Sequence, residues 1–188
     1  MDFITELSTT PGTYNTTFQL PTIFKDNTQY DKFLFYTMAR RISGSNYTSF
    51  SFVFVDDSGV EITGGATYNS MADNRIGTYQ SQGRNLAVNY IPLGSMGTNN
   101  SYDNIHNQLF ISNAYESGKL TTWQSLGGGN YQGSSSTFNN GSNQLYGNSG
   151  WLQDNQLVAG IHFQQTYSSW SPPYNATALI KVFGIKVS

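Results

Sequence analysis

The chain has 188 residues and no cysteine, and its formal net charge is −2 with only 11% charged residues. A chain of this length fits one domain whose core needs no disulfide bond. Nine Lys and Arg residues are too few for the basic surface that nucleic acids require, and no apolar run approaches a membrane span, so we expect neither a nucleic-acid partner nor membrane insertion.

The N-terminal segment, residues 1–25, contains Pro11 and Pro21, and proline favours extended or turn backbone. The segment predicts an extended lead-in that could pack against a neighbouring chain. Its start has neither the basic residues nor the apolar core of a signal peptide, so we expect none. The remaining residues, 26–188, are expected to form a single β-sandwich domain.

Two strands with period-two alternation are predicted next, over residues 32–42 and 47–55. In the second strand, three alternate phenylalanines share one face while the neighbouring serines point away, which is typical of a half-buried strand. Residues 56–59 read Asp-Asp-Ser-Gly and predict a hairpin turn, because Asp and Ser bond their own backbone and Gly takes a positive φ. A short return strand is expected over residues 60–62.

Further strand candidates recur along the rest of the chain, over residues 75–79, 85–93, 108–113, 119–126, 131–138, 157–163 and 177–187. Gly-, Asn- and Ser-rich loops separate them, and the longest of these loops are expected at 94–107 and 139–155. No stretch shows helical periodicity, and short strands at this spacing predict an all-β fold. We expect an antiparallel β-sandwich of the jelly-roll type.

Residues suited to catalysis are few. The best carboxylate candidates, Asp103, Glu116 and Asp154, lie in predicted loops and share no motif, whereas glycoside hydrolysis needs two carboxylates at a controlled separation. The nucleophile elbow of hydrolases and the phosphate-binding loop are both missing from the sequence. We therefore expect no enzymatic activity and assign no catalytic residues.

Candidate metal ligands are also sparse. His106 and His162 are far apart in a chain without cysteine, so the spacing of a zinc site is absent. His162 alternates with apolar neighbours, which predicts a side chain that faces the surface. Asp56 and Asp57 could offer oxygen ligands to calcium, but closing a hairpin is the simpler interpretation. We expect no metal and no cofactor.

Aromatic side chains are the remaining candidates for a binding site. Trp123, Trp151, Tyr167, Trp170 and Tyr174 lie in or beside polar stretches, and the last three share one predicted loop with two prolines. Exposed Trp and Tyr side chains stack on sugar rings or anchor protein interfaces. The alternative is that this loop folds its aromatics onto the edge of the sandwich. We take Trp151, Tyr167, Trp170 and Tyr174 as candidate ligand or interface residues.

Several segments carry a resemblance to a known family. Residues 160–163 have the form Gly-Ile-x-Phe, and residues 178–186 alternate before closing on aromatic-Gly-Ile-Lys. Residues 109–113 and 30–35 are similar to earlier strands of the same family. On these motifs the chain resembles the β-jelly-roll virion proteins of tailed bacteriophages. The resemblance implies a non-enzymatic structural protein that assembles as a homo-oligomer, with a trimer suited to a threefold virion site.

We therefore expect a bacteriophage virion structural protein on the surface of the capsid or tail, where it contacts other virion proteins. A capsid decoration protein, a head fibre and a tail-associated protein all fit this description. The alternative function is a carbohydrate-binding module or a receptor-binding adhesin that recognises host surface glycans. A glycan-cleaving enzyme on a jelly-roll scaffold is a third option, which the shortage of paired carboxylates disfavours.

Overall fold

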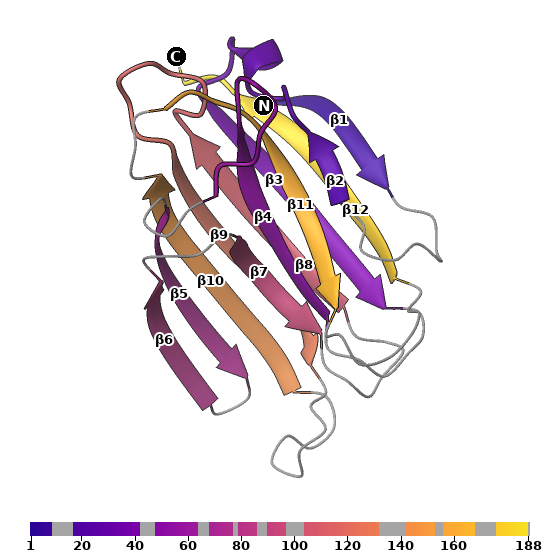
Figure 1. The fold of residues 1–188 in the computed structure, drawn as a ribbon. Coiled ribbons are helices and arrows are strands. Elements are labelled where there is room, and N and C mark those ends of the chain that lie inside the picture. The colour runs from indigo at the N-terminus through magenta and orange to yellow at the C-terminus, as the bar shows by residue number, and fades with distance from the viewer. Residues whose placement is uncertain are drawn as a thin grey trace.

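The computed structural model describes most of the chain as two β-sheets packed face to face (Figure 1). The described residues are 1–8, 17–41, 48–63, 68–76, 79–85, 90–96, 104–131, 142–152, 156–167 and 176–187. Within them lie the strands β1 (Asp2–Ser8), β2 (Thr17–Leu20), β3 (Lys32–Arg41), β4 (Thr48–Asp56), β5 (Tyr68–Ile76), β6 (Tyr79–Asn85), β7 (Ile91–Met96), β8 (Asn104–Ser112), β9 (Thr122–Tyr131), β10 (Ser142–Leu152), β11 (Val158–Tyr167) and β12 (Ala176–Ile185), with a short 3-10 helix, η1 (Lys25–Asn27).

The strand order is that of a jelly roll with two inserted hairpins. The smaller sheet has the order β2-β11-β4-β7, and the larger sheet begins β1-β12-β3-β8. Together these strands form the two four-stranded sheets of a jelly roll, in which the first strand pairs with the last. The hairpins β5–β6 and β9–β10 widen the larger sheet to eight strands, and Figure 1 shows β5 and β6 extending beyond the smaller sheet. The predicted all-β sandwich of jelly-roll type is confirmed.

The described residues of the N-terminal segment belong to both sheets. β1 pairs antiparallel with β12 at the edge of the larger sheet, and β2 pairs with β11 in the smaller one. The segment predicted as a lead-in is thus extended, but its strands pair within the chain's own sandwich. Edge pairing of this kind satisfies the backbone groups that an unpaired β12 would expose.

Phenylalanines dominate the core between the sheets. The expected shared face of β4 is confirmed, because the side chains of Phe50, Phe52 and Phe54 are fully buried. Phe163 of β11 stacks on Phe50 with ring centroids 5.9 Å apart, and Phe35 of the larger sheet lies 5.5 Å from the Phe163 ring. Aromatic rings from both sheets therefore meet in one cluster, which holds the two layers together.

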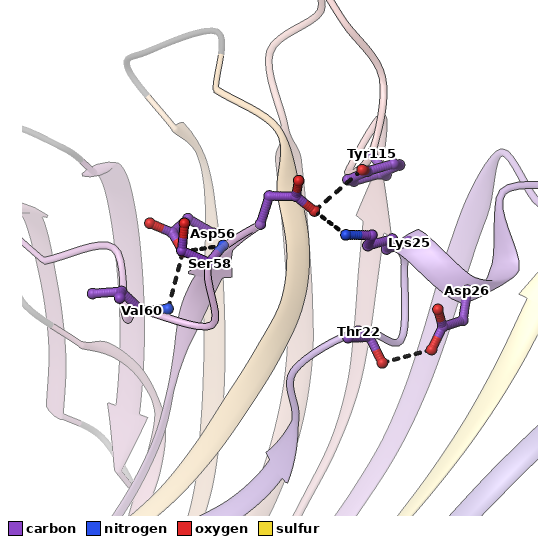
Figure 2. Close-up of polar contacts among 8 residues, drawn as sticks. Thr22, Lys25, Asp26, Asp56, Ser58, Val60 and Tyr115 are labelled. Atoms are coloured by element: carbon purple, nitrogen blue, oxygen red, sulfur yellow. Dashed lines mark hydrogen bonds and ion pairs between the residues drawn. The ribbon is translucent and has the colours of Figure 1, made fainter.

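The predicted hairpin turn after β4 is also confirmed (Figure 2). The Asp56 carboxylate accepts hydrogen bonds from the backbone N–H of Ser58 at 2.8 Å and of Val60 at 2.9 Å. Gly59 takes the positive φ of 82° that the turn requires. The expected return strand is reduced to one bridge between Val55 and Glu61.

Several predicted boundaries differ from the structure. The expected loop 139–155 holds β10, and the expected strand 75–79 contains the turn between β5 and β6. The expected loop 94–107 is shorter, since β7 runs to Met96 and β8 begins at Asn104. The strand predicted over 131–138 lies outside the described residues, except for Tyr131 at the end of β9. Glycine and asparagine disfavour strands locally, but pairing on both sides overrides that preference in β10.

An ion pair joins the hairpin turn to η1 and to the connection between β8 and β9 (Figure 2). Lys25 Nζ lies 2.6 Å from Asp57 Oδ1, and the Tyr115 hydroxyl donates to the same oxygen at 3.2 Å. The hydrogen bond and charge of Lys25 lower the pKa of Asp57 from its ordinary value of 3.8, and Asp57 raises the pKa of Lys25. This carboxylate is engaged in a structural contact, which agrees with the turn interpretation.

The Asp57→Asn variant is expected to be less stable than the wild type at neutral pH, with no such difference in strong acid. A carboxyl whose pKa is lowered by folding stabilises the native state above its unfolded value of 3.8, and this contribution disappears as the pH falls through the folded-state pKa. The effect is small because the ion pair is exposed. Thermal unfolding of both proteins at neutral pH and at about pH 2 measures it; an equal difference at both values would contradict it.

Candidate binding surface on the larger sheet

The outer face of the eight-stranded sheet, which points away from the smaller sheet, carries most of the exposed large hydrophobic side chains. Alternation along each strand sends one side chain into the core and the next to this face. In β8, Leu109 and Ile111 are fully buried, whereas Phe110 between them is 37% exposed. The outward side chains of this kind are Phe3, Tyr36, Met38, Phe110, Leu126, Leu145 and Trp151. An exposed apolar area of this extent marks an interaction surface.

The first depression on this face is the apolar hollow. Antiparallel register forms a cross-strand row from Leu179, Met38, His106, Gly128 and Leu145. The next row consists of Lys181, Tyr36, Gln108, Leu126 and Gly147. Because Gly128 carries no side chain, the surrounding residues enclose an open hollow of about 550 Å³. Its walls are mainly the apolar parts of Tyr36, Met38, Leu126, Leu145 and Leu179.

The second depression is the aromatic hollow, which lies further along β8, β9 and β10. It has a volume of about 480 Å³ and shares no lining residue with the apolar hollow. Phe110 and Trp151, which is 40% exposed, stand on β8 and β10 with β9 between them. Its polar lining comes from Ser112, Thr122, Gln124 and Ser149. None of the side chains that line it carries a charge, so its chemistry suits a neutral ligand with both apolar and hydrogen-bonding groups.

Charge is sparse beside these hollows. Lys181, at the edge of the apolar hollow, has its Nζ 3.3 Å from Glu6 Oε2 of β1. Both side chains are about half exposed, so the pair contributes little to stability. Its effect is to neutralise the single cationic group that lines the apolar hollow apart from His106.

The structure separates the four aromatic residues predicted as a site. Trp151 lies on strand β10 of the larger sheet, whereas Tyr167 is the last residue of β11 in the smaller sheet. β10 and β11 end at opposite ends of the sandwich (Figure 1), so Trp151 and Tyr167 do not share a site. Trp170 and Tyr174 lie outside the described residues. Only Trp151 is placed on a described candidate surface.

Trp123, by contrast, belongs to the core. It is buried among the rings of Phe52 and Phe54, and its indole Nε1–H donates to Asn148 Oδ1 at 3.1 Å. Asn148 in turn donates to the Pro92 carbonyl of β7 at 3.4 Å. Trp123 and Trp151 thus point to opposite faces of the larger sheet, although both sit in polar sequence. The sequence signal for Phe110 and Gln124, which was missed as a site, is their outward position in alternating strands.

The prediction that His162 faces the surface is wrong. Its side chain is only 8% exposed, and Nδ1 lies 3.1 Å from Glu61 Oε1. Gln164 Nε2 donates to the same oxygen at 3.1 Å, and the Tyr90 hydroxyl donates to Glu61 Oε2 at 3.3 Å. His162 does alternate with core residues as expected. The segment after the hairpin turn, however, places Glu61 against this outer face of the smaller sheet and covers it.

The candidate catalytic carboxylates do not gather in the described part of the chain. Glu116 pairs with Lys119 at 2.9 Å in an exposed turn, while Asp103 and Asp154 lie outside the described residues. Among the described residues, no three His, Cys, Asp or Glu side chains are grouped as a metal site would need. The same residues include no helix of the length and apolar character needed to cross a membrane.

Comparisons with known proteins leave the family resemblance where the sequence placed it. No family model matches the chain, and no curated protein matches its sequence.

Proposed function

We propose that the protein is a non-enzymatic structural protein of a bacteriophage virion, a capsid decoration or tail accessory protein that assembles as a homo-oligomer. The observation that carries the proposal is the exposed apolar outer face on a jelly-roll scaffold. The sequence motifs that resemble phage virion proteins support it. Jelly rolls also occur in viral capsid and lectin domains, so the fold is compatible with this role and with others.

The apolar hollow is the proposed centre of self-association. Leu126 is 60% exposed and Leu145 is 48% exposed, and each loses water contact only if another surface covers it. Burying such side chains contributes about 1.5–3 kcal/mol each at a well-packed interface. Apolar residues at the centre with a neutralised charge at the edge is the usual layout of a homo-oligomeric interface.

The Leu126→Lys variant is expected to convert the oligomer to a monomer. A lysine at the centre of the interface would bury an unpaired charge in every subunit. Light scattering of the purified proteins at micromolar concentration measures the mass. Leu120→Lys is the matched control, because Leu120 is exposed but lies in the connection between β8 and β9, away from the hollow. A monomeric wild type, or an oligomer that survives Leu126→Lys, would contradict self-association through this surface.

The virion role has its own test. Mass spectrometry of particles purified from the host that carries this gene should detect the protein in a fixed number of copies per particle. Its absence from those particles would remove the virion proposal, whatever the oligomeric state of the isolated protein.

A second candidate function, recognition of host surface glycans, is favoured by one observation. Trp151 stands half-exposed at the aromatic hollow, beside neutral hydroxyl and amide side chains. The two functions are compatible, since a protein on a virion surface can also bind host sugars. The two hollows have separate lining residues, so occupation of the apolar hollow by a second subunit leaves the groups of the aromatic hollow uncommitted.

A further inference from the structure

We propose that the aromatic hollow is a binding subsite for a neutral oligosaccharide, with Trp151 and Phe110 as stacking platforms and Gln124 and Ser149 as hydrogen-bonding groups. This inference rests on the second candidate function and gives it a location and a ligand class. It does not require the virion role.

The strand register sets the spacing of the two aromatic platforms. One cross-strand row contains Phe110, Gln124 and Ser149, and the next contains Ser112, Thr122 and Trp151. Neighbouring strands lie about 4.8 Å apart, so β8 and β10 are separated by about 10 Å across β9. The two rings therefore stand on either side of a polar strip, at a separation that suits successive units of a sugar chain rather than one small ring.

The lining matches the two kinds of surface that a pyranose presents. The faces of the ring carry C–H groups, whose partial positive charge is attracted to the negative face of an aromatic side chain. The rim carries hydroxyl groups, each of which donates and accepts hydrogen bonds. Gln124 offers both a carbonyl oxygen and an amide NH₂, while the serine and threonine hydroxyls donate or accept as needed.

The polar groups of the hollow are free to serve a ligand. The side chains of Ser112, Thr122, Gln124 and Ser149 make no hydrogen bond to another described residue. No charged side chain lines the hollow, which disfavours phosphate, carboxylate and nucleic-acid ligands because nothing would compensate their charge. Its volume of about 480 Å³ falls within the range of ordinary small-ligand sites. The platforms are on paired strands, so the site is held rigid before binding.

The test is calorimetric titration of the full chain with soluble neutral oligosaccharides. The probes are cellohexaose, maltohexaose, laminarihexaose, mannohexaose and the tetramer of N-acetylglucosamine, each to about 10 mM so that millimolar affinities are detected. At least one is expected to bind the wild type. Trp151→Ala and Gln124→Ala are expected to weaken that binding about tenfold or more. Leu145→Ala is the matched control on the same strand, because Leu145 lines only the apolar hollow.

Each outcome decides between the site and the function. Binding that is lost in Trp151→Ala and Gln124→Ala but kept in Leu145→Ala supports the proposal. Binding that is equal in all variants overturns the aromatic hollow as the site and leaves glycan recognition to other residues. No binding of any probe overturns both the site and the glycan function, while the light-scattering and particle experiments still judge the virion role. Unfolding curves of the variants should match the wild type, since Trp151 and Gln124 are exposed.

Discussion

Replacing Gly160 with alanine is expected to destabilise the protein by about 3 kcal/mol, at the upper end of the cost of overpacking. A Cβ on Gly160 would lie 2.2 Å from the Leu20 carbonyl oxygen and 2.3 Å from the Pro21 carbonyl group. These are backbone atoms at the end of β2, so they cannot move aside as a flexible side chain would. Relief of the clash requires β2 to separate from β11, whose register pairs Leu20 with Ile161. Urea unfolding followed by circular dichroism measures the loss.

Gly147→Ala is the matched control for this prediction. Gly147 also lies in the interior of a strand, but the nearest atom to its Cβ position is the Ser125 carbonyl oxygen at an ordinary 3.9 Å. Its replacement should change stability by less than about 0.5 kcal/mol. Equal unfolding midpoints for the Gly160 and Gly147 variants would show that the contact between Gly160 and the end of β2 does not constrain the fold.

Phe163→Ala is the substitution with the largest expected effect, about 3–5 kcal/mol. Phe163 is fully buried, and its ring contacts Phe35, Phe50 and Phe52. Removing it leaves a cavity between the sheets that the paired strands cannot close. The measurement is the free energy of unfolding in urea. Because a small domain has only about 5–15 kcal/mol in total, the variant is also expected to give much less soluble protein.

Phe110→Ala provides the control for the size of the side chain. Phe110 is on the outer face and more than a third exposed, so its truncation removes much less buried area. We expect a loss below about 1.5 kcal/mol. A loss for Phe110→Ala as large as that for Phe163→Ala would mean that the outer face is buried in the folded protein. Light scattering on the same samples would then show whether self-association covers it.

Both predictions concern the Gly-Ile-x-Phe segment that carries much of the family resemblance. Gly160 and Phe163 are explained by packing against β2 and by the aromatic core. Gly184 of the closing motif is similar, because a Cβ there would lie 2.4 Å from the Tyr30 ring. These motifs therefore report on how the first and last strands of a jelly roll fit together. Function has to be sought elsewhere, on the outer face of the larger sheet.

Local sequence patterns predicted the strands in which burial follows alternation. β3, β4 and the hairpin turn at Asp56 lie where the sequence placed them, because each strand has one apolar face or a turn whose side chains bond their own backbone. β10 was missed for the opposite reason. Its residues have low intrinsic strand propensity, and its stability comes from pairing with β9 and β5, which are distant in the sequence.

The candidate site shows the same division. Trp151 was identified from its type and polar surroundings, but its neighbours Phe110, Gln124 and Ser149 come from three strands whose register no local pattern specifies. His162 was placed on the correct strand and parity. Its burial depends on Glu61, about a hundred residues earlier in the chain, which reaches it through the loop after β4.

The sequence by itself determined that this protein is an all-β sandwich, because period-two alternation and turn chemistry act over a few residues. Only the tertiary structure decided which aromatic residues are core and which are surface. Trp123 and Trp151 have similar local sequence, yet pairing with the same neighbouring strand sends one inward to Asn148 and the other outward to the aromatic hollow. Side-chain direction depends on the register, and the register is set by long-range pairing that buries one face of each sheet.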